Sequence, residues 1–430
     1  MGSSNNPFKE KPNSSLSKKL LSYLLSAFLP LILLHFYFKP FYFSLPFSYT
    51  LNPNFISPSS NSQEVLRKTI VSQAATCDYS NGEWVPHNLE PLYNGTTCDT
   101  IKQGQNCMVF GRPDKDYLHW KWNPKNCTLP RFNPRKFLDL VKNRHVAFVG
   151  DSLARNQLES LLCMVSVSSK PDLLYTGGED NKFRKWHVRS HNVTFSIYWS
   201  PFLVKGVERT IEKDFNTLHL ESIDERWAAD LDHIDMLVLS IGHWYLHPAV
   251  YYYGSSIIGC HFCANYTETG FYDVFGKALS TTFDSIIKRK GSNNNNHGNG
   301  IRVFLTTFSP AHFEGQWDKL GACPKTRPFK QGERVLDEVE EELRRIGMAE
   351  VEEANRRCGN SENDLKFEAL DISKLAVLRP DGHPGPYMNP FPFANGVLER
   401  VPNDCMHWCL PGPIDTWNEI LLDVIKRWKR

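Results

Sequence analysis

Apolar runs of strand length alternate with helical segments along much of the chain after residue 140. Strands are expected at His145–Val149, Val193–Trp199, Met236–Ile241, Ile301–Thr306 and Phe367–Ile372, and helices at Leu153–Met164, Gln331–Ile346 and Ile414–Trp428. The helices show apolar residues at helical spacing, as at Val335, Val339, Leu343 and Ile346. Strands alternating with helices predict an α/β fold whose central parallel sheet is covered by helices on both faces.

The first 76 residues follow a different pattern. Leu20–Phe38 contains no Asp, Glu, Lys or Arg and is long enough to cross a bilayer as a helix. Four lysines precede it, at positions 9, 11, 18 and 19, which predicts a cytoplasmic N-terminus and a lumenal remainder. The alternative is a cleaved signal peptide, but the run is long for one and no A-x-A-like site follows. We therefore expect a tail (1–19), a transmembrane anchor (20–38) and a Pro-, Ser- and Asn-rich stem (39–76).

Cysteine usage supports an oxidising compartment. All 11 cysteines lie between Cys77 and Cys409. Because their number is odd, at least one is free or pairs between chains. The disulfide candidates are Cys77, Cys98, Cys107, Cys127, Cys163, Cys323, Cys405 and Cys409. Sequons predict glycosylation at Asn94, Asn126, Asn192 and Asn265. Residues 77–135 read as a loop-rich, disulfide-stapled subdomain, and residues 136–430 as the catalytic domain.

Charge and aromatic content narrow the possible partners. Lys and Arg number 49 against 47 Asp and Glu, a net charge of +2, and no basic surplus indicates a nucleic-acid partner. Aromatic residues make up 13% of the chain and include 11 Trp. Most of these belong in a core, and the remainder could stack on sugar rings.

The segment around Ser152 has the form of a nucleophile turn. An apolar strand ends at Val149, Gly150 allows a tight turn, and a helix begins directly after Asp151 and Ser152. This order places a serine hydroxyl at the carboxyl edge of a sheet and at a helix N-terminus, where backbone N–H groups can stabilise an oxyanion. The alternative is that Asp151 and Ser152 only cap the helix. A serine nucleophile also needs a base and a residue that orients the base.

Asp404 and His407, three residues apart, are the favoured pair, with Cys405 and Cys409 on either side of His407. A carboxylate beside an imidazole fixes the tautomer of the ring and stabilises the imidazolium. The competing pair is Asp381 and His383 in the loop PDGHPGP. We rank His383 second, as a groove or substrate contact.

Two separated motifs, GDS…RNQ at residues 150–157 and DCMHWCLPGPIDTWNE at 404–419, resemble the plant trichome birefringence-like family (TBL/DUF231) of Golgi polysaccharide O-acetyltransferases. The resemblance covers residues 77–430. It implies an SGNH/GDSL-like three-layer α/β/α fold, a triad of Ser152, His407 and Asp404, and double displacement through an acetylated serine. It also implies a single-pass type II Golgi membrane protein. The segments SIGHWYLHP and GCHFC are similar to the xyloglucan branch and more loosely to the mannan branch.

One departure concerns the oxyanion hole. SGNH hydrolases usually supply an Asn from a Gly-x-Asn-Asp block, whereas the comparable strand end here reads SIGHWYLHP. The candidates for oxyanion or substrate contacts are Gly150, Asp151, Arg155, Asn156, Gly242, His243, Trp244 and His383.

No bound cofactor or metal is expected. His243 and His247 lack the Glu of a zinc helix, and Cys260-x-x-Cys263 has no second pair, so a disulfide is favoured there. No coenzyme A or nucleotide motif stands out, which fits an acetyl group derived from acetyl-CoA and supplied by a separate membrane protein. We expect a xyloglucan O-acetyltransferase. The alternatives are a mannan or glucomannan O-acetyltransferase, a polysaccharide acetyl esterase with the same triad, and a non-catalytic polysaccharide-binding protein.

Overall fold

The computed structural model describes residues 77–291, 300–359 and 365–428, which belong to one unit spanning residues 74–430. The predicted tail, anchor and stem lie outside the described residues. Within the three described ranges, no helix combines the length and the apolar character needed to cross a bilayer.

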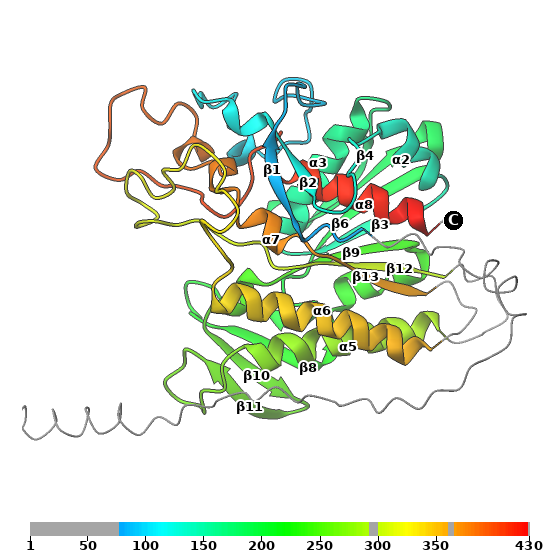
Figure 1. Cartoon of the computed structure of the whole chain (residues 1–430). Helices are drawn as coiled ribbons and strands as arrows, with labels where there is room; N and C mark the ends of the chain where they lie inside the picture. The colour runs from blue at the N-terminus through cyan, green and yellow to red at the C-terminus, as the bar shows by residue number, and fades with distance from the viewer. Residues whose placement is uncertain (1–76, 292–299, 360–364, 429–430) are drawn as a thin grey trace, which may run out of the picture. The chain divides into compact units, whose positions relative to one another are not determined.

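A seven-stranded sheet forms the centre of this unit (Figure 1). Its strand order is β13 (Lys366–Leu370), β12 (Arg302–Thr306), β9 (Met236–Ser240), β3 (His145–Gly150), β6 (Val193–Trp199), β5 (Phe183–Val188) and β4 (Asp172–Gly177). The first five strands are parallel, and β5 and β4 add an antiparallel edge. The five parallel strands are the predicted ones, with ends shifted by at most two residues, so the predicted parallel sheet is confirmed.

Helices cover both faces of the sheet, as predicted (Figure 1). On one side lie α2 (Pro134–Leu140), α3 (Ser152–Ser166) and α8 (Asp415–Arg427), and on the other α5 (Tyr272–Lys290) and α6 (Glu338–Cys358). Side chains of β3 alternate between two cores: Val146 and Phe148 pack with the first group, Ala147 and Val149 with the second. Side chains on both faces of β3 are buried after His145, which is why the sequence of this strand is almost continuously apolar.

Several elements were not predicted. A second sheet has the order β11 (Ser256–His261), β10 (Ala249–Tyr253), β8 (Asn216–Ile223) and β7 (Val204–Val207). A hairpin of β1 (Gly82–Pro86) and β2 (Trp120–Pro124) lies in the Cys-rich part, and the short helices are α4 (Glu225–Ala228) and α7 (Ser373–Ala376). These strands are partly exposed, so their apolar signal is weak. The α5 helix did carry a helical pattern, since Val274, Phe275, Ala278, Leu279 and Phe283 are buried at helical spacing.

The helix predicted at Gln331–Ile346 was placed wrongly. The observed helix, α6, begins at Glu338, because Asp337 and Glu340 form a capping box in which each side chain accepts from the other's backbone N–H. Val335, which counted towards the predicted apolar face, lies before the helix and is exposed. The helix then continues through Gly347 to Cys358, and a Cβ added at Gly347 would lie 3.2 Å from the Leu305 side chain.

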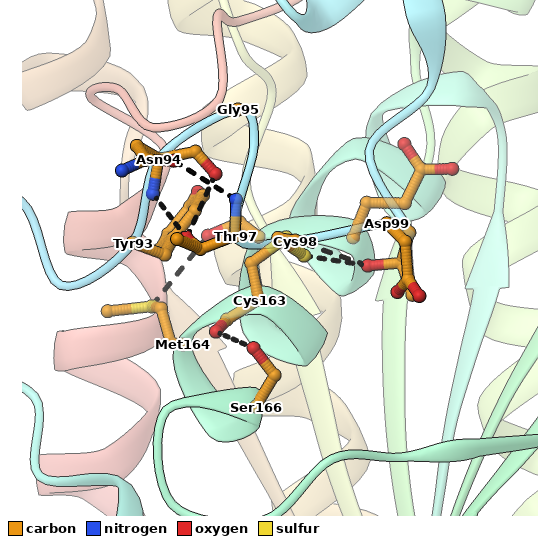
Figure 2. Close-up of a disulfide and its surroundings, with 12 residues drawn as sticks. Tyr93, Asn94, Gly95, Thr97, Cys98, Asp99, Cys163, Met164 and Ser166 are labelled. Carbon is orange, nitrogen blue, oxygen red and sulfur yellow. Dashed lines mark hydrogen bonds between the residues drawn. A yellow bond between two sulfur atoms is a disulfide. The ribbon is translucent and has the colours of Figure 1, made fainter.

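Five disulfide bonds join ten of the cysteines: Cys77–Cys127, Cys98–Cys163, Cys107–Cys409, Cys260–Cys263 and Cys323–Cys405. All eight candidates are therefore bonded, and Cys358 is the odd one. Figure 2 shows how Cys98, in the loop after Asn94, meets Cys163 on α3. The Cys-rich part is thus fastened to the helix that begins at Ser152.

Candidate active site

The turn after β3 depends on a glycine. Gly150 has φ of +153°, and a Cβ at this position would lie 1.8 Å from the backbone oxygen of Ser240. The next residue, Asp151, donates its backbone N–H to that same oxygen at 3.1 Å. Strands β3 and β9 are therefore in direct backbone contact where the turn begins, and any side chain at position 150 would separate them.

Asp151, rather than Ser152, caps α3. The Oδ1 atom of Asp151 accepts from the backbone N–H of Leu153 at 2.9 Å. Its Oδ2 atom is buried without a partner, and burial raises the pKa of Asp151 to about 6. Ser152 is the first residue of α3 and is half-buried, and its hydroxyl forms no hydrogen bond with a described residue. Capping therefore leaves the Ser152 hydroxyl free for other chemistry.

Asp404 and His407 form a hydrogen-bonded pair. His407 Nδ1 lies 2.7 Å from Asp404 Oδ2, and Asp404 Oδ1 accepts from the backbone N–H groups of Met406 and His407 at 3.0 and 2.9 Å. The stretch is a tight turn rather than a helix. We call residues 403–410 the base segment. Since Nδ1 faces a carboxylate, it carries the proton, and Nε2 is left as the proton acceptor.

The pair shifts the pKa values of both groups. Burial alone would raise the pKa of Asp404, but the His407 ring and three hydrogen bonds hold it well below its ordinary value. Burial opposes the charged form of His407, yet Asp404 outweighs burial and raises the pKa of His407 above its ordinary value. The geometry therefore favours an imidazole that readily takes a proton.

Asn156 joins the nucleophile helix to the base segment. Its Oδ1 accepts from the backbone N–H of Trp408 at 2.8 Å, and its Nδ2 donates to the backbone oxygen of Trp408 at 3.2 Å. Asn156 lies four residues after Ser152, on the same face of α3. Asp151 and His407 also influence each other electrostatically. These contacts bring the start of α3 and the base segment together, although no hydrogen bond joins Ser152 and His407 in this structure.

Gly242, His243 and Trp244 lie after β9, which neighbours β3. Gly242 has φ of +151°, and a Cβ there would lie 2.5 Å from Phe308. His243 Nε2 lies 2.8 Å from the backbone oxygen of Ser309, and burial lowers the pKa of His243 to about 4. The His243 ring is thus neutral, and its Nε2–H donates to the backbone oxygen of Ser309. Trp244 packs edge-on to Trp199, with ring centroids 5.8 Å apart.

Arg155 is a buried cation without an internal acceptor. Its guanidinium lies 5.2 Å from the centroid of the Trp199 ring, and Trp199 pairs with Gly150 at the end of β6. Only 6% of Arg155 is exposed, its Nε is buried without a partner, and it forms no hydrogen bond through its side chain to any described residue. The Arg155 side chain, three residues after Ser152 on α3, therefore carries donors that no described residue accepts.

The competing pair does not form. The Asp381 carboxylate accepts from Arg379 at 2.8 and 3.0 Å, not from His383. His383 is 4% exposed, with Nε2 2.7 Å from His312 Nδ1 and Nδ1 2.7 Å from the backbone oxygen of His407. The structure places His383 behind the base segment, where its ring nitrogens face protein atoms rather than a groove. The contact between His312 and His383 was not predicted, because no local sequence pattern joins positions 312 and 383.

The four predicted glycosylation sites lie on the surface. Asn94, Asn126, Asn192 and Asn265 are all exposed, so each sequon is accessible. Cys260 and Cys263 lie near Glu268, but their sulfur atoms are bonded to each other and neither is a free thiolate.

Comparison with known proteins places the chain in a family. Residues 129–424 match the PC-Esterase family, described as a GDSL/SGNH-like acyl-esterase family found in Pmr5 and Cas1p, and residues 75–128 match the PMR5 N terminal Domain. The chain belongs to the PC-Esterase family. The PMR5 N terminal Domain match ends at residue 128 and the PC-Esterase match begins at residue 129, close to the predicted subdomain boundary at residue 135.

Two relatives of this PC-Esterase protein align with nearly its whole length. It is 56% identical to "Xyloglucan O-acetyltransferase 1" of Populus trichocarpa, over 98% of this chain and 97% of the relative. It is 49% identical to "Xyloglucan O-acetyltransferase 1" of Arabidopsis thaliana, over 98% and 99%. "Protein trichome birefringence-like 26" of Arabidopsis thaliana is 39% identical, over 81% of this chain and 77% of the relative. The resemblance to the trichome birefringence-like family is confirmed.

Proposed function

We propose that this protein is a xyloglucan O-acetyltransferase in which Ser152 is the nucleophile, His407 the base and Asp404 the residue that orients the base. The observation that carries the site is the Asp404–His407 hydrogen bond, on a segment that Asn156 fastens to the nucleophile helix. Support for the substrate comes from the relatives named as xyloglucan O-acetyltransferases, at 49–56% identity.

The reaction has two half-steps. In the first, Ser152 Oγ attacks the carbonyl of the acetyl donor while His407 Nε2 takes the hydroxyl proton and passes it to the departing group. In the second, His407 removes the proton of a sugar hydroxyl, which attacks the acetylated serine. The ester bond to Ser152 breaks, the acetyl group passes to the sugar, and the proton returns to Ser152. Asp404 stabilises the imidazolium that forms in both half-steps.

The oxyanion of each tetrahedral intermediate needs donors. The backbone N–H of Ser152 is one candidate, because it lies at the first position of α3, where helical N–H groups have no intrahelical partner. The backbone N–H of Gly242 is a second. We assign Arg155 to a substrate oxygen, since its guanidinium is buried and has no acceptor within the described protein.

The proposed location is the Golgi membrane, as a single-pass type II protein with its catalytic domain in the lumen. The apolar run at residues 20–38 and the lysines before it support this orientation. Five disulfide bonds and four exposed sequons fit an oxidising, glycosylating compartment. The acetyl group would then reach the site from a donor on the lumenal side.

A polysaccharide acetyl esterase is the second candidate, favoured by the description of the family as acyl-esterases. Transferase and esterase share the acetylated serine and differ in whether a sugar hydroxyl or water attacks it. Ser152 and His407 are half-buried, so both a sugar hydroxyl and water have access to the acetylated serine. Identification of the product distinguishes the two activities.

The test uses purified full-length protein with 4-nitrophenyl acetate as donor and deacetylated xyloglucan, mannan or xylan as acceptor. We expect acetylated xyloglucan as the main product and an acetyl group on Ser152 by mass spectrometry of tryptic peptides. Ser152→Ala should lose both. The matched control is Ser166→Ala, at the other end of α3, whose hydroxyl only donates to the backbone oxygen of Cys163. Release of acetate without polysaccharide acetylation would make the protein an esterase. Full transfer by Ser152→Ala would remove the serine from the mechanism.

A further inference from the structure

Two buried histidines lie directly behind the base segment. His383 Nδ1 is 2.7 Å from the backbone oxygen of His407, and His383 Nε2 is 2.7 Å from His312 Nδ1. His312 Nε2 in turn is 2.8 Å from the backbone oxygen of Val377. Three polar contacts thus form a continuous row from the backbone oxygen of Val377, at the C-terminal end of α7, to the backbone oxygen of His407.

The number of protons in this row is limited. Both ends are carbonyl oxygens, which only accept, so three hydrogen bonds would require three ring protons. Two neutral imidazoles supply two. Burial lowers the pKa of His312 to about 4, and burial together with His312 holds the pKa of His383 well below its ordinary value, so both rings are neutral at neutral pH. One of the three contacts must therefore lack a proton.

His383 consequently has a single proton and two competing acceptors. It can donate from Nδ1 to the carbonyl of His407, or from Nε2 to His312 Nδ1. The second option leaves two acceptor atoms, His383 Nδ1 and the oxygen of His407, facing each other at 2.7 Å. Such a contact is repulsive. The first option moves the contact that lacks a proton away from the base segment, either to the pair His312 Nδ1 and His383 Nε2 or to His312 Nε2 and the backbone oxygen of Val377.

The rest of the base segment cannot easily move in response. Trp408 stacks on the His383 ring, with centroids 4.3 Å apart and planes at 25°. The backbone of Trp408 is held on the other side by Asn156. His407 is therefore fixed between the nucleophile helix and the histidine pair, and the contact at its carbonyl helps decide where the ring lies.

We propose that His383 is a positioning residue for the base, donating from Nδ1 to the backbone carbonyl of His407, and that His312 competes for this proton. The inference rests on the proposed role of His407. It assigns to the PDGHPGP loop a part in placing the base, without contact between His383 and substrate.

Nuclear magnetic resonance of histidine nitrogens tests the proton directly, without any need for acetyl transfer. In the full-length protein labelled with ¹⁵N-histidine, His383→Gln identifies the signals of His383 by their loss. In His312→Leu the competing acceptor is gone, and we expect His383 to carry its proton on Nδ1 only. A His383 ring protonated on Nε2 in this variant would overturn the proposal.

Kinetics test the consequence. His383→Phe keeps an aromatic ring on Trp408 but removes the donor, and we expect kcat to fall by roughly 10- to 100-fold with KM unchanged, because a small displacement of the base affects the chemical step. His383→Gln, whose amide can donate to the carbonyl of His407, should recover most of this loss. His312→Leu should keep most of kcat.

Two results would contradict the positioning role: full kcat in His383→Phe, or an equal loss in His312→Leu and His383→Phe. Should His383→Phe not fold, the comparison of His383→Gln with His312→Leu and the nitrogen spectra still decide. Failure of the proposed function itself would look different, since Ser152→Ala would then retain transfer whatever the state of His383.

Discussion

The base segment and the β10–β11 hairpin are each tied by disulfide bonds, but their partners lie at very different distances along the chain. Cys409 and Cys405 of the base segment bond to Cys107 and Cys323, which are 302 and 82 residues away. In the hairpin region, Cys260 bonds to Cys263, three residues away. The base segment is therefore fixed to other parts of the molecule, whereas the disulfide at the hairpin closes only the short stretch at the end of β11.

Their surfaces differ in the same way. Cys405, Trp408, Cys409 and Leu410 of the base segment are completely buried. On and beside the hairpin, Tyr253 is 52% exposed and Phe262 is 68% exposed. Long-range bonds and burial are concentrated where a ring must be held within a fraction of an ångström for proton transfer, and the hairpin has no such requirement. The following predictions test this contrast, from the largest expected effect to the smallest.

Asp404→Asn should lower kcat for acetyl transfer by about 10⁴-fold, since the amide can donate to His407 Nδ1 and thereby favours the wrong tautomer. The protein should remain folded because the substitution preserves size. Initial rates with deacetylated xyloglucan measure the loss. The control is Glu268→Gln beside the hairpin, whose carboxylate lies 3.1 Å from His261 Nδ1. A comparable loss in Glu268→Gln would end the contrast between the two regions.

The pH profile should follow His407. Because the neutral ring is the base and Asp404 raises the pKa of His407 above 6.5, kcat/KM should rise with pH through an inflection above 6.5. Below that inflection the rate should fall about tenfold per pH unit. Asp404→Asn should move the inflection downwards. An unchanged inflection in Asp404→Asn would separate the observed titration from this pair.

Both members of the pair stabilise the folded protein, and their contributions to the free energy of unfolding change with pH in opposite directions. The pKa of Asp404 is lowered, so its contribution is present above its ordinary value and lost as pH falls. The pKa of His407 is raised, so its contribution is present below 6.5 and lost as pH rises through the raised value.

Removal of the long-range disulfide by Cys107→Ser with Cys409→Ser should lower the free energy of unfolding by about 2–5 kcal/mol. The bond closes a long loop, and its loss also frees the end of the base segment. Urea denaturation without reductant measures the change. A loss under about 1 kcal/mol would mean that the Cys323–Cys405 bond and the hydrogen bonds are enough to hold the base segment.

Asn156→Ala removes both side-chain hydrogen bonds to Trp408. We expect the free energy of unfolding to fall by about 1–3 kcal/mol, and kcat to fall as the base segment loosens. Asn355→Ala is the matched control, because Asn355 binds the backbone N–H and oxygen of Phe367 in the same manner, away from the site. It should lose similar stability and keep kcat. Equal kcat losses would show that stability, not position, is at issue.

The smallest effect is expected for Cys260→Ser with Cys263→Ser. This disulfide closes a loop of three residues, so its removal should cost under about 2 kcal/mol and leave kcat unchanged. The measurements are the same denaturation and transfer assays. A loss as large as that of the Cys107–Cys409 bond would reverse the comparison of the two regions.

The sequence determined the elements whose signals are local. Buried parallel strands such as β3 are continuous apolar runs, and the Gly150-Asp151-Ser152 turn carries its own glycine, cap and hydroxyl. The pairing of Asp404 with His407 was also predictable from the sequence, since both residues lie in one turn. The start of α6 was predicted too early, although both residues of its capping box, Asp337 and Glu340, can be read from the sequence. Partly exposed strands, such as β10 and β11, gave too weak a pattern to be predicted.

Tertiary structure decided everything that joins distant residues. Contacts between segments far apart in the chain determine the pairing of the cysteines. They also determine the hydrogen bonds of Asn156 to the backbone of Trp408 and the contact of His312 with His383. Local periodicity reports which face of an element is buried, but not which other element covers it. A buried polar group must find a partner wherever the fold brings one, and for His383 that partner proved to be the backbone of the proposed base.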